Sequence, residues 1–390
     1  MFARAIIYNL MTIGAMLLAG CSHDDVTIEI TPSEPVAISF MPALAPTLNE
    51  GEETTRAGQT GAMNSEDLRT TGFGVFASLN NSHTPDMMFN QEVSFTFVGD
   101  IENPEHDPLK GYWSYQPLKY WPNGLTPESD FYISAYAPYQ DQPVSAIGTG
   151  IIGMSNNTVS PYIDYRYCEK PEEVVDLLWF YEKPNSIPAA GTLGMKMRHA
   201  LARLEVNVAL ASDPGTTKVL VEEITLTGKM AKTGRLSLSS QTTEGSGDDT
   251  RYYPVWTNQT YEDRTITITN DDNDADSYGI IDPQVRYIKD LPYAWQPAGL
   301  STTQQNALST GDRKTYIYLI PQPAAIPEVG DPTGLDLKVE VKYQKWVSGA
   351  STPEAGVKSI DTSPVTTPIT VGSPLKGNTK YKLNITLSGI

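Results

Sequence analysis

Most of the chain alternates apolar and polar residues, which is the pattern of strands with one buried and one solvated face. Past residue 30, no segment sustains the apolar period of 3.6 residues that indicates a long helix. Glycine, proline and Asn/Asp clusters separate the alternating runs at short intervals, as is typical of β-sandwiches. We therefore expect an all-β fold. The expected strands include residues 36–40, 73–77, 93–98, 204–208, 220–226, 265–269, 316–320, 335–341 and 381–387.

Polar stretches suggest where the chain divides. A chain of 390 residues is best read as two domains. The proline-containing stretch 182–191 is the preferred boundary, so we expect one β-sandwich domain at 21–185 and a second at 186–390. Residues 48–64 form a polar, glycine-containing loop after the first expected strand.

Charge and composition exclude some classes of function. Asp and Glu number 46 against 28 Lys and Arg, which gives a formal net charge of −18. Phosphate contacts need clustered Lys and Arg, so we expect no nucleic-acid partner. Four histidines and two cysteines leave little room for a zinc site, and we expect neither a metal nor a cofactor. Cys168 has no histidine nearby in sequence and is interpreted as a packed side chain.

The N-terminus resembles a secretory signal. Residues 1–20 carry one charge and an apolar stretch that is too short to span a membrane. They end in Leu18-Ala19-Gly20-Cys21, which resembles the lipobox of bacterial lipoproteins. That resemblance implies a diacylated (palmitate-bearing) Cys21, outer-membrane lipid as a partner before processing, and a place on the outer membrane. The acidic run 22–25 resembles a surface-export signal of Bacteroidetes lipoproteins, although a solvated linker fits it about equally well.

No catalytic constellation stands out. Asp272, Asp274 and Asp276 begin like a calcium loop but lack its glycine and final glutamate, so a solvated turn is favoured. His199 has no nucleophile beside it and is interpreted as structural. The chain has no G-x-S-x-G, P-loop or H-E-x-x-H motif. We therefore expect no enzymatic activity, with a glycan hydrolase as the rival because carboxylates are plentiful.

Aromatic residues crowd the short segment 111–121. Trp113 and Trp121 belong to it, and rings of this kind either fill a sandwich core or stack on sugars. Core packing is the favoured interpretation. A ligand platform at Trp113 and Trp121 is the alternative, and it would make the chain a lipid-anchored glycan-binding surface protein.

Several motifs, taken in chain order, resemble the fimbrillin family of Bacteroidetes. They lie at 71–77, 90–93, 113–122, 131–139, 175–178, 199–204 and 380–390. The resemblance implies two transthyretin-like β-sandwich domains in tandem. It also implies a structural role in type V pili, with other pilus subunits as partners and cell adhesion as the purpose. It leaves open whether the chain is a shaft, anchor or tip subunit, and it names no receptor.

The same resemblance implies a scheme of assembly. A trypsin-like protease cuts after an arginine in an N-terminal loop, and this releases the first strand. Arg56 is the matching arginine and Ala57 the new first residue, whereas an ordinary loop arginine is the alternative reading. Arg69 is a weaker second choice.

A strand from a neighbouring subunit then fills the groove. The C-terminus is the expected donor, because Tyr381, Leu383, Ile385 and Leu387 share one face at period two. Four inserted apolar side chains would contribute roughly 6–12 kcal/mol before ordering costs. The alternative is a final strand that stays in its own domain.

Overall fold

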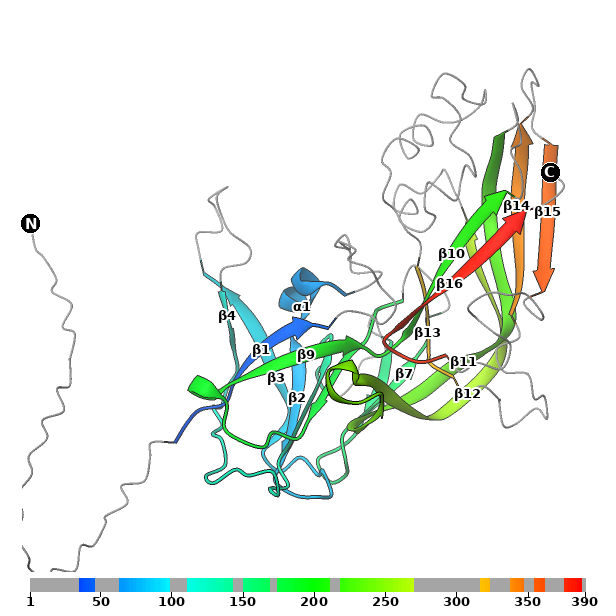
Figure 1. Ribbon diagram of the computed structural model, residues 1–390. Helices are drawn as coiled ribbons and strands as arrows, with labels where there is room; N and C mark the ends of the chain where they lie inside the picture. Colours follow the sequence, from blue (N-terminus) through cyan, green and yellow to red (C-terminus); the bar gives the residue numbers. More distant parts are fainter. Residues whose placement is uncertain are drawn as a thin grey trace, which may run out of the picture. The chain divides into compact units, whose positions relative to one another are not determined.

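A computed structural model of the chain describes residues 35–45, 63–98, 111–142, 150–168, 174–210, 218–269, 316–322, 337–346, 354–361 and 375–387. Within these residues the regular secondary structure is almost entirely strand, with one short α-helix, which confirms the all-β expectation (Figure 1). The helix α1 spans Ser65–Thr71. The strands are β1 (Ser39–Leu44), β2 (Phe73–Ser78), β3 (Met88–Phe97), β4 (Gly111–Ser114), β5 (Tyr132–Ala137), β6 (Ile151–Met154), β7 (Tyr162–Arg166), β8 (Leu178–Glu182), β9 (Thr192–His199), β10 (Ala202–Leu210), β11 (Lys218–Glu244), β12 (Arg251–Thr269), β13 (Tyr316–Leu319), β14 (Leu337–Trp346), β15 (Glu354–Asp361) and β16 (Thr379–Leu387).

One sheet contains seven strands in the order β1-β9-β8-β5-β2-β3-β4. β1 runs parallel to β9, and the other neighbours are antiparallel. The first strand was expected at 36–40, but β1 starts at Ser39. Before it, the chain makes a separate bridge between Ala37 and Tyr120.

Two further sheets come mostly from the later part of the chain. A three-stranded sheet has the order β13-β10-β16. In the other, the order is β15-β14-β11-β7-β6, and β12 also pairs with β11. Three pairings cross the expected boundary at residue 185, because β9 pairs with both β1 and β8, and β7 pairs with β11. A division into two transthyretin-like sandwiches stays a prediction.

The seven-stranded sheet has apolar side chains packed on both faces. In β2, Phe73 and Val75 join one buried cluster, whereas Phe76 joins the other. β5 and β8 divide their residues in the same alternating way. This double burial explains why β2 is a continuous apolar run in the sequence instead of an alternating one.

We call the two clusters core A and core B. Core A consists of Ile38, Phe40, Met63, Leu68, Phe73, Val75, Ala77, Met88, Val93, Tyr115, Trp121, Phe131, Ile133, Ala135, Ala137, Leu178, Phe180, Leu193, Met195 and Met197. Core B joins Phe76, Tyr136 and Trp179 of the seven-stranded sheet to residues of the later sheets, such as Leu236 and Val339. Residues from the start of the described chain therefore contribute to core A.

The helix α1 is too short for the sequence pattern to reveal it. Asn64 caps its N-terminus by accepting hydrogen bonds from the N–H groups of Glu66 and Asp67, and the Asp67 carboxylate accepts in return from Asn64 N–H. The helix ends at Gly72, whose N–H donates to Leu68 O. No helix among the described residues has the length and apolar character needed to cross a membrane.

Candidate functional site

The strand that the family resemblance marks as removable, β1, lies at the edge of the seven-stranded sheet. It runs alongside β9 in register, from Ser39 opposite Thr192 to Leu44 opposite Met197 (Figure 1). The Ser39 and Thr192 hydroxyls lie 2.7 Å apart. Pro42 interrupts the N–H donors of β1, as an edge strand tolerates. On this side, β1 is therefore attached through its contact with β9.

The residues just before β1 are attached to a second segment. Ile38 N–H donates to Lys119 O at 2.8 Å, and Trp121 N–H donates to Val36 O at 2.9 Å. The Tyr115 hydroxyl donates to Ile38 O at 2.9 Å. Val36–Leu44, which we call the first-strand segment, is thus held at one end by residues 119–121 and at the other by β9.

The first-strand segment turns one apolar face into core A. Ile38 is 1% exposed and Phe40 is 5% exposed, whereas the next residue, Met41, is 62% exposed. The Phe40 ring centroid lies 5.5 Å from that of Tyr115 and 6.1 Å from that of Phe73. Removal of this segment would uncover aromatic rings that are otherwise shielded from water.

Gly191, at the turn that leads into β9, makes room for the first-strand segment. Its φ is +71°, and a Cβ atom there would lie 2.4 Å from Ala37 O. Both the conformation and the contact call for glycine. The Trp121 indole N–H donates to Gly191 O at 2.8 Å. This hydrogen bond links residues 119–121 to the turn before β9, the two parts of the chain that hold the first-strand segment.

A buried acid–histidine pair contacts Met63, the first residue that the structure describes after β1 and Ala45. The Asp176 Oδ2 atom accepts from Met63 N–H at 3.0 Å and lies 2.5 Å from His199 Nδ1. Asp176 is 1% exposed and His199 is 9% exposed. We call these three residues the Asp176 node. Asp176 and His199 each belong to a motif of the family resemblance, at 175–178 and 199–204. Nothing in the spacing of these motifs predicted that the two side chains meet, and the sequence analysis gave Asp176 no role.

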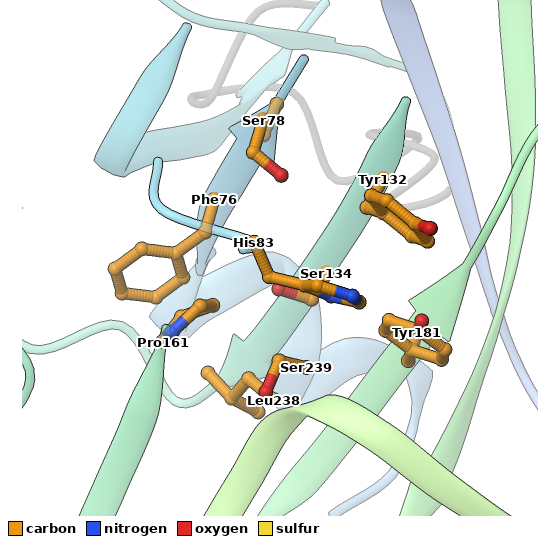
Figure 2. Close-up of a pocket in the computed structure, with 10 residues that line it drawn as sticks. Phe76, Ser78, His83, Tyr132, Ser134, Pro161, Tyr181, Leu238 and Ser239 are labelled. Carbon is orange, nitrogen blue, oxygen red and sulfur yellow. The ribbon is translucent and has the colours of Figure 1, made fainter. Parts of the chain in front are cut away.

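Figure 2 shows a small hollow between the seven-stranded sheet and β11. The His83 ring stacks on Tyr132 with centroids 3.9 Å apart, and burial lowers the pKa of His83. Ser78 Oγ is buried without a hydrogen-bond partner among the described residues. The hollow has room for about one water molecule and not for a sugar ring.

The residues predicted for lipidation and cutting lie outside the described residues. They are Cys21, Arg56 and Ala57. The acidic run with Asp272, Asp274 and Asp276 also lies outside them. Within the part of the chain that is described, no group of three or more His, Cys, Asp and Glu residues could hold a metal ion.

The predicted donor strand is β16, at the edge of the three-stranded sheet. It runs parallel to β10, with Leu383 opposite Val206, Ile385 opposite Val208 and Leu387 opposite Leu210. Tyr381 is partly buried, and its hydroxyl accepts from Lys376 N–H at 2.8 Å. In this structure β16 therefore fills a place in its own sheet, and its use as a donor stays a prediction.

The two tryptophans proposed as a ligand platform have different surroundings. Trp121 is 3% exposed and belongs to core A, so its ring has no free face for a sugar. Trp113 is partly buried, with its ring 5.1 Å from both Phe73 and Phe95. This geometry agrees with the favoured interpretation, core packing.

Comparison with known proteins gives a family. The model of the family described as fimbrillin-like matches residues 55–389. No curated protein is similar enough to the chain to count as a match. Among solved structures, a fimbrial protein from Bacteroides vulgatus is 18% identical, with a TM-score of 0.47 and coverage of 90% of this chain and 95% of that one. A proposed cell adhesion protein from Bacteroides uniformis is 12% identical, with a TM-score of 0.42 and coverage of 91% and 94%, respectively.

Proposed function

The chain belongs to the fimbrillin-like family, and from this premise we propose that it is a structural subunit of a cell-surface fimbria that serves adhesion. In this proposal the chain is exported as a lipoprotein through Cys21 and is cut after Arg56. It then polymerises as a type V pilus by strand exchange. The observation that carries the proposal is the placement of the first-strand segment, an edge strand whose buried face belongs to core A.

The first-strand segment can leave without dismantling the sheet. Because β1 stands at the end of the strand order, its departure leaves the pairing of β9 with β8 in place. The chain that follows β1 contains Arg56, so one cut there separates the strand from everything after it. Segments with few attachments open independently of the rest of a fold.

The position beside β9 that β1 leaves would restrict which strand can replace it. A replacement strand in the same register must run parallel to β9 and present apolar side chains where Ile38 and Phe40 lie. Burial of these two side chains is worth about 3–6 kcal/mol. Main-chain hydrogen bonds to β9 and to residues 119–121 would add affinity, as in other cases of β-augmentation.

β16 has the alternating apolar residues that such an occupant needs, at an edge of its own sheet. Donation requires it to leave β10. Deletion of residues 380–390 should therefore give a folded monomer that cannot polymerise. Fibres of normal length from this deletion variant would show that another segment is the donor.

A reversible disulfide tests whether β1 must leave. Ser39 and Thr192 are register partners, so Ser39→Cys with Thr192→Cys should lock β1 onto β9. We expect the locked chain, once cut by trypsin, to stay monomeric by light scattering and electron microscopy. Reduction should restore polymerisation.

The matched control is a second disulfide at a distant pair of threonines. Thr233 and Thr260 are register partners in β11 and β12, with hydroxyls 2.6 Å apart. This lock should leave polymerisation unchanged. Polymerisation of the oxidised Ser39–Thr192 variant at the normal rate would refute strand exchange at β1. A subunit that never polymerises but keeps its lipid would instead be an anchor.

A further inference from the structure

The Asp176 node fixes the chain at the point where the described residues resume after β1. Met63 is 6% exposed, and its N–H donates to the carboxylate of Asp176. Asp176 lies two residues before β8, and His199 is the last residue of β9, so the carboxylate is held beside the seven-stranded sheet. Ala200 N–H donates to Leu177 O at 2.6 Å, which closes the same junction. The backbone of Met63 is thereby tied to the junction between β8 and β9.

The helix α1 follows the node directly and carries Arg69. Asn64 caps the helix, and Leu68 is 2% exposed within core A. The Arg69 guanidinium lies 5.5 Å from the centre of the Phe95 ring. The second-choice cleavage arginine is therefore part of a short helix that is docked at its start by the node and in its middle by Leu68.

We propose that Asp176 and His199 are positioning residues for proteolytic processing: His199 holds Asp176, Asp176 holds Met63, and together they keep α1 docked and the Arg69–Thr70 bond closed to a trypsin-like protease. Cleavage, in which water adds across the bond to leave a carboxylate and an amine, is then confined to the chain before residue 63. This inference rests on the proposed function, in which the subunit is cut, and it assigns the node a role in choosing where.

The physical basis is local opening. A protease binds its substrate as an extended chain, so a helix must detach and unwind before it is cut. A seven-residue helix is not stable by itself and depends on its attachments. When opening and closing are fast, the rate of cutting follows the population of the open form. Loss of the hydrogen bond from Met63 N–H to the Asp176 carboxylate should therefore raise the rate at which the Arg69–Thr70 bond is cut.

The test is limited trypsin digestion of the full chain, with each cleaved bond followed by mass spectrometry. In Asp176→Ala, we expect the Arg69–Thr70 bond to be cut about 10- to 100-fold faster than in the unmodified chain. Asp176→Asn keeps an oxygen that can accept from Met63 N–H, and it should restore most of the protection. Adding Arg69→Gln to Asp176→Ala should abolish the new cut.

A matched control separates local from general destabilisation. Leu236→Ala removes a fully buried side chain of core B on β11, in a different sheet from β8 and β9, and should leave the Arg69 bond protected in the folded protein. Equal rates at this bond in the unmodified chain and in Asp176→Ala would overturn the inference. Equal acceleration in Asp176→Ala and Leu236→Ala would overturn it as well.

A second measurement covers the case in which Asp176→Ala does not fold. In the unmodified chain, the Met63 and Leu68 amides should exchange slowly and at similar rates, since one opening exposes both. Fast exchange at Met63 beside slow exchange at Leu68 would overturn the inference. Failure of the unmodified chain to be cut before residue 63 would count against the proposed processing step, while the comparison at Arg69 still decides the role of the node.

Discussion

Truncation of Phe40 separates the free energy that holds β1 from the stability of the rest of the fold. Phe40 is 5% exposed and packs against Phe73 and Tyr115, whereas its neighbour Met41 is 62% exposed. Phe→Ala changes at buried positions cost about 3–5 kcal/mol. Met41→Ala, on the same strand but facing solvent, is the matched control and should cost little.

The free-energy cost of Phe40→Ala should appear as more frequent opening of the first-strand segment. Ile38 N–H donates to Lys119 O, so its amide exchanges with solvent when the first-strand segment opens. A loss of about 3–5 kcal/mol predicts roughly 100- to 4,000-fold faster exchange of this amide in Phe40→Ala. The amides of β2, an interior strand of the sheet, should change much less.

The measurement is native-state hydrogen exchange on the uncut full chain, read residue by residue. Equal exchange of the Ile38 amide in Phe40→Ala and Met41→Ala would refute the packing role given to Phe40. Exchange of the Ile38 amide at the same rate as the β2 amides in every variant would show that β1 opens only with the whole sheet. In that case β1 could not be a separately removable strand.

Three other perturbations follow from the same geometry. Gly191→Ala should lower the thermal midpoint, because a Cβ there would lie 2.4 Å from Ala37 O at a φ of +71°; an unchanged midpoint would contradict this contact. Tyr115→Phe removes the hydroxyl that donates to Ile38 O and should cost about 0.5–1.5 kcal/mol in a denaturant titration. Burial lowers the pKa of His83 in the folded chain below the ordinary value of about 6.5. The neutral ring therefore stabilises the fold above a pH of about 6.5, and this stabilisation is lost as the pH falls through the lowered pKa. His83→Gln should accordingly lessen the fall in stability between pH 8 and pH 5, and an unchanged pH dependence would count against the burial of this ring.

Local patterns predicted most strands because each reflects which faces of a strand are buried. β2 was expected as a buried run, and its alternate residues do enter core A and core B. β10, β12 and β16 contain the alternating segments that predicted them. These patterns depend on neighbouring residues alone, so a single sequence contains them in full.

Short elements and strand limits were harder to predict. β1 starts three residues later than expected, because the bridge at Ala37 and the pairing with β9 are separate attachments. The helix α1 is too short to show a period of 3.6 residues. Its signal was the pair Asn64 and Asp67, three residues apart, which is the spacing of a capping box.

The contacts that define the site join residues far apart in sequence. Ser39 meets Thr192, and Asp176 meets His199, but no periodicity links either pair. The family resemblance predicted that the first strand is removable, whereas the partners of that strand came from the structure. Buried polar pairs such as Asp176–His199 satisfy each other after the chain has folded, so composition and spacing do not reveal them.

The most direct test of strand exchange is the N-terminal sequence and intact mass of this protein recovered from the cell surface. We expect a chain that begins at Ala57, without lipid and without the first-strand segment, in polymers that resist dissociation. A chain that begins at lipidated Cys21 and retains β1, recovered from those same polymers, would contradict strand exchange at this site.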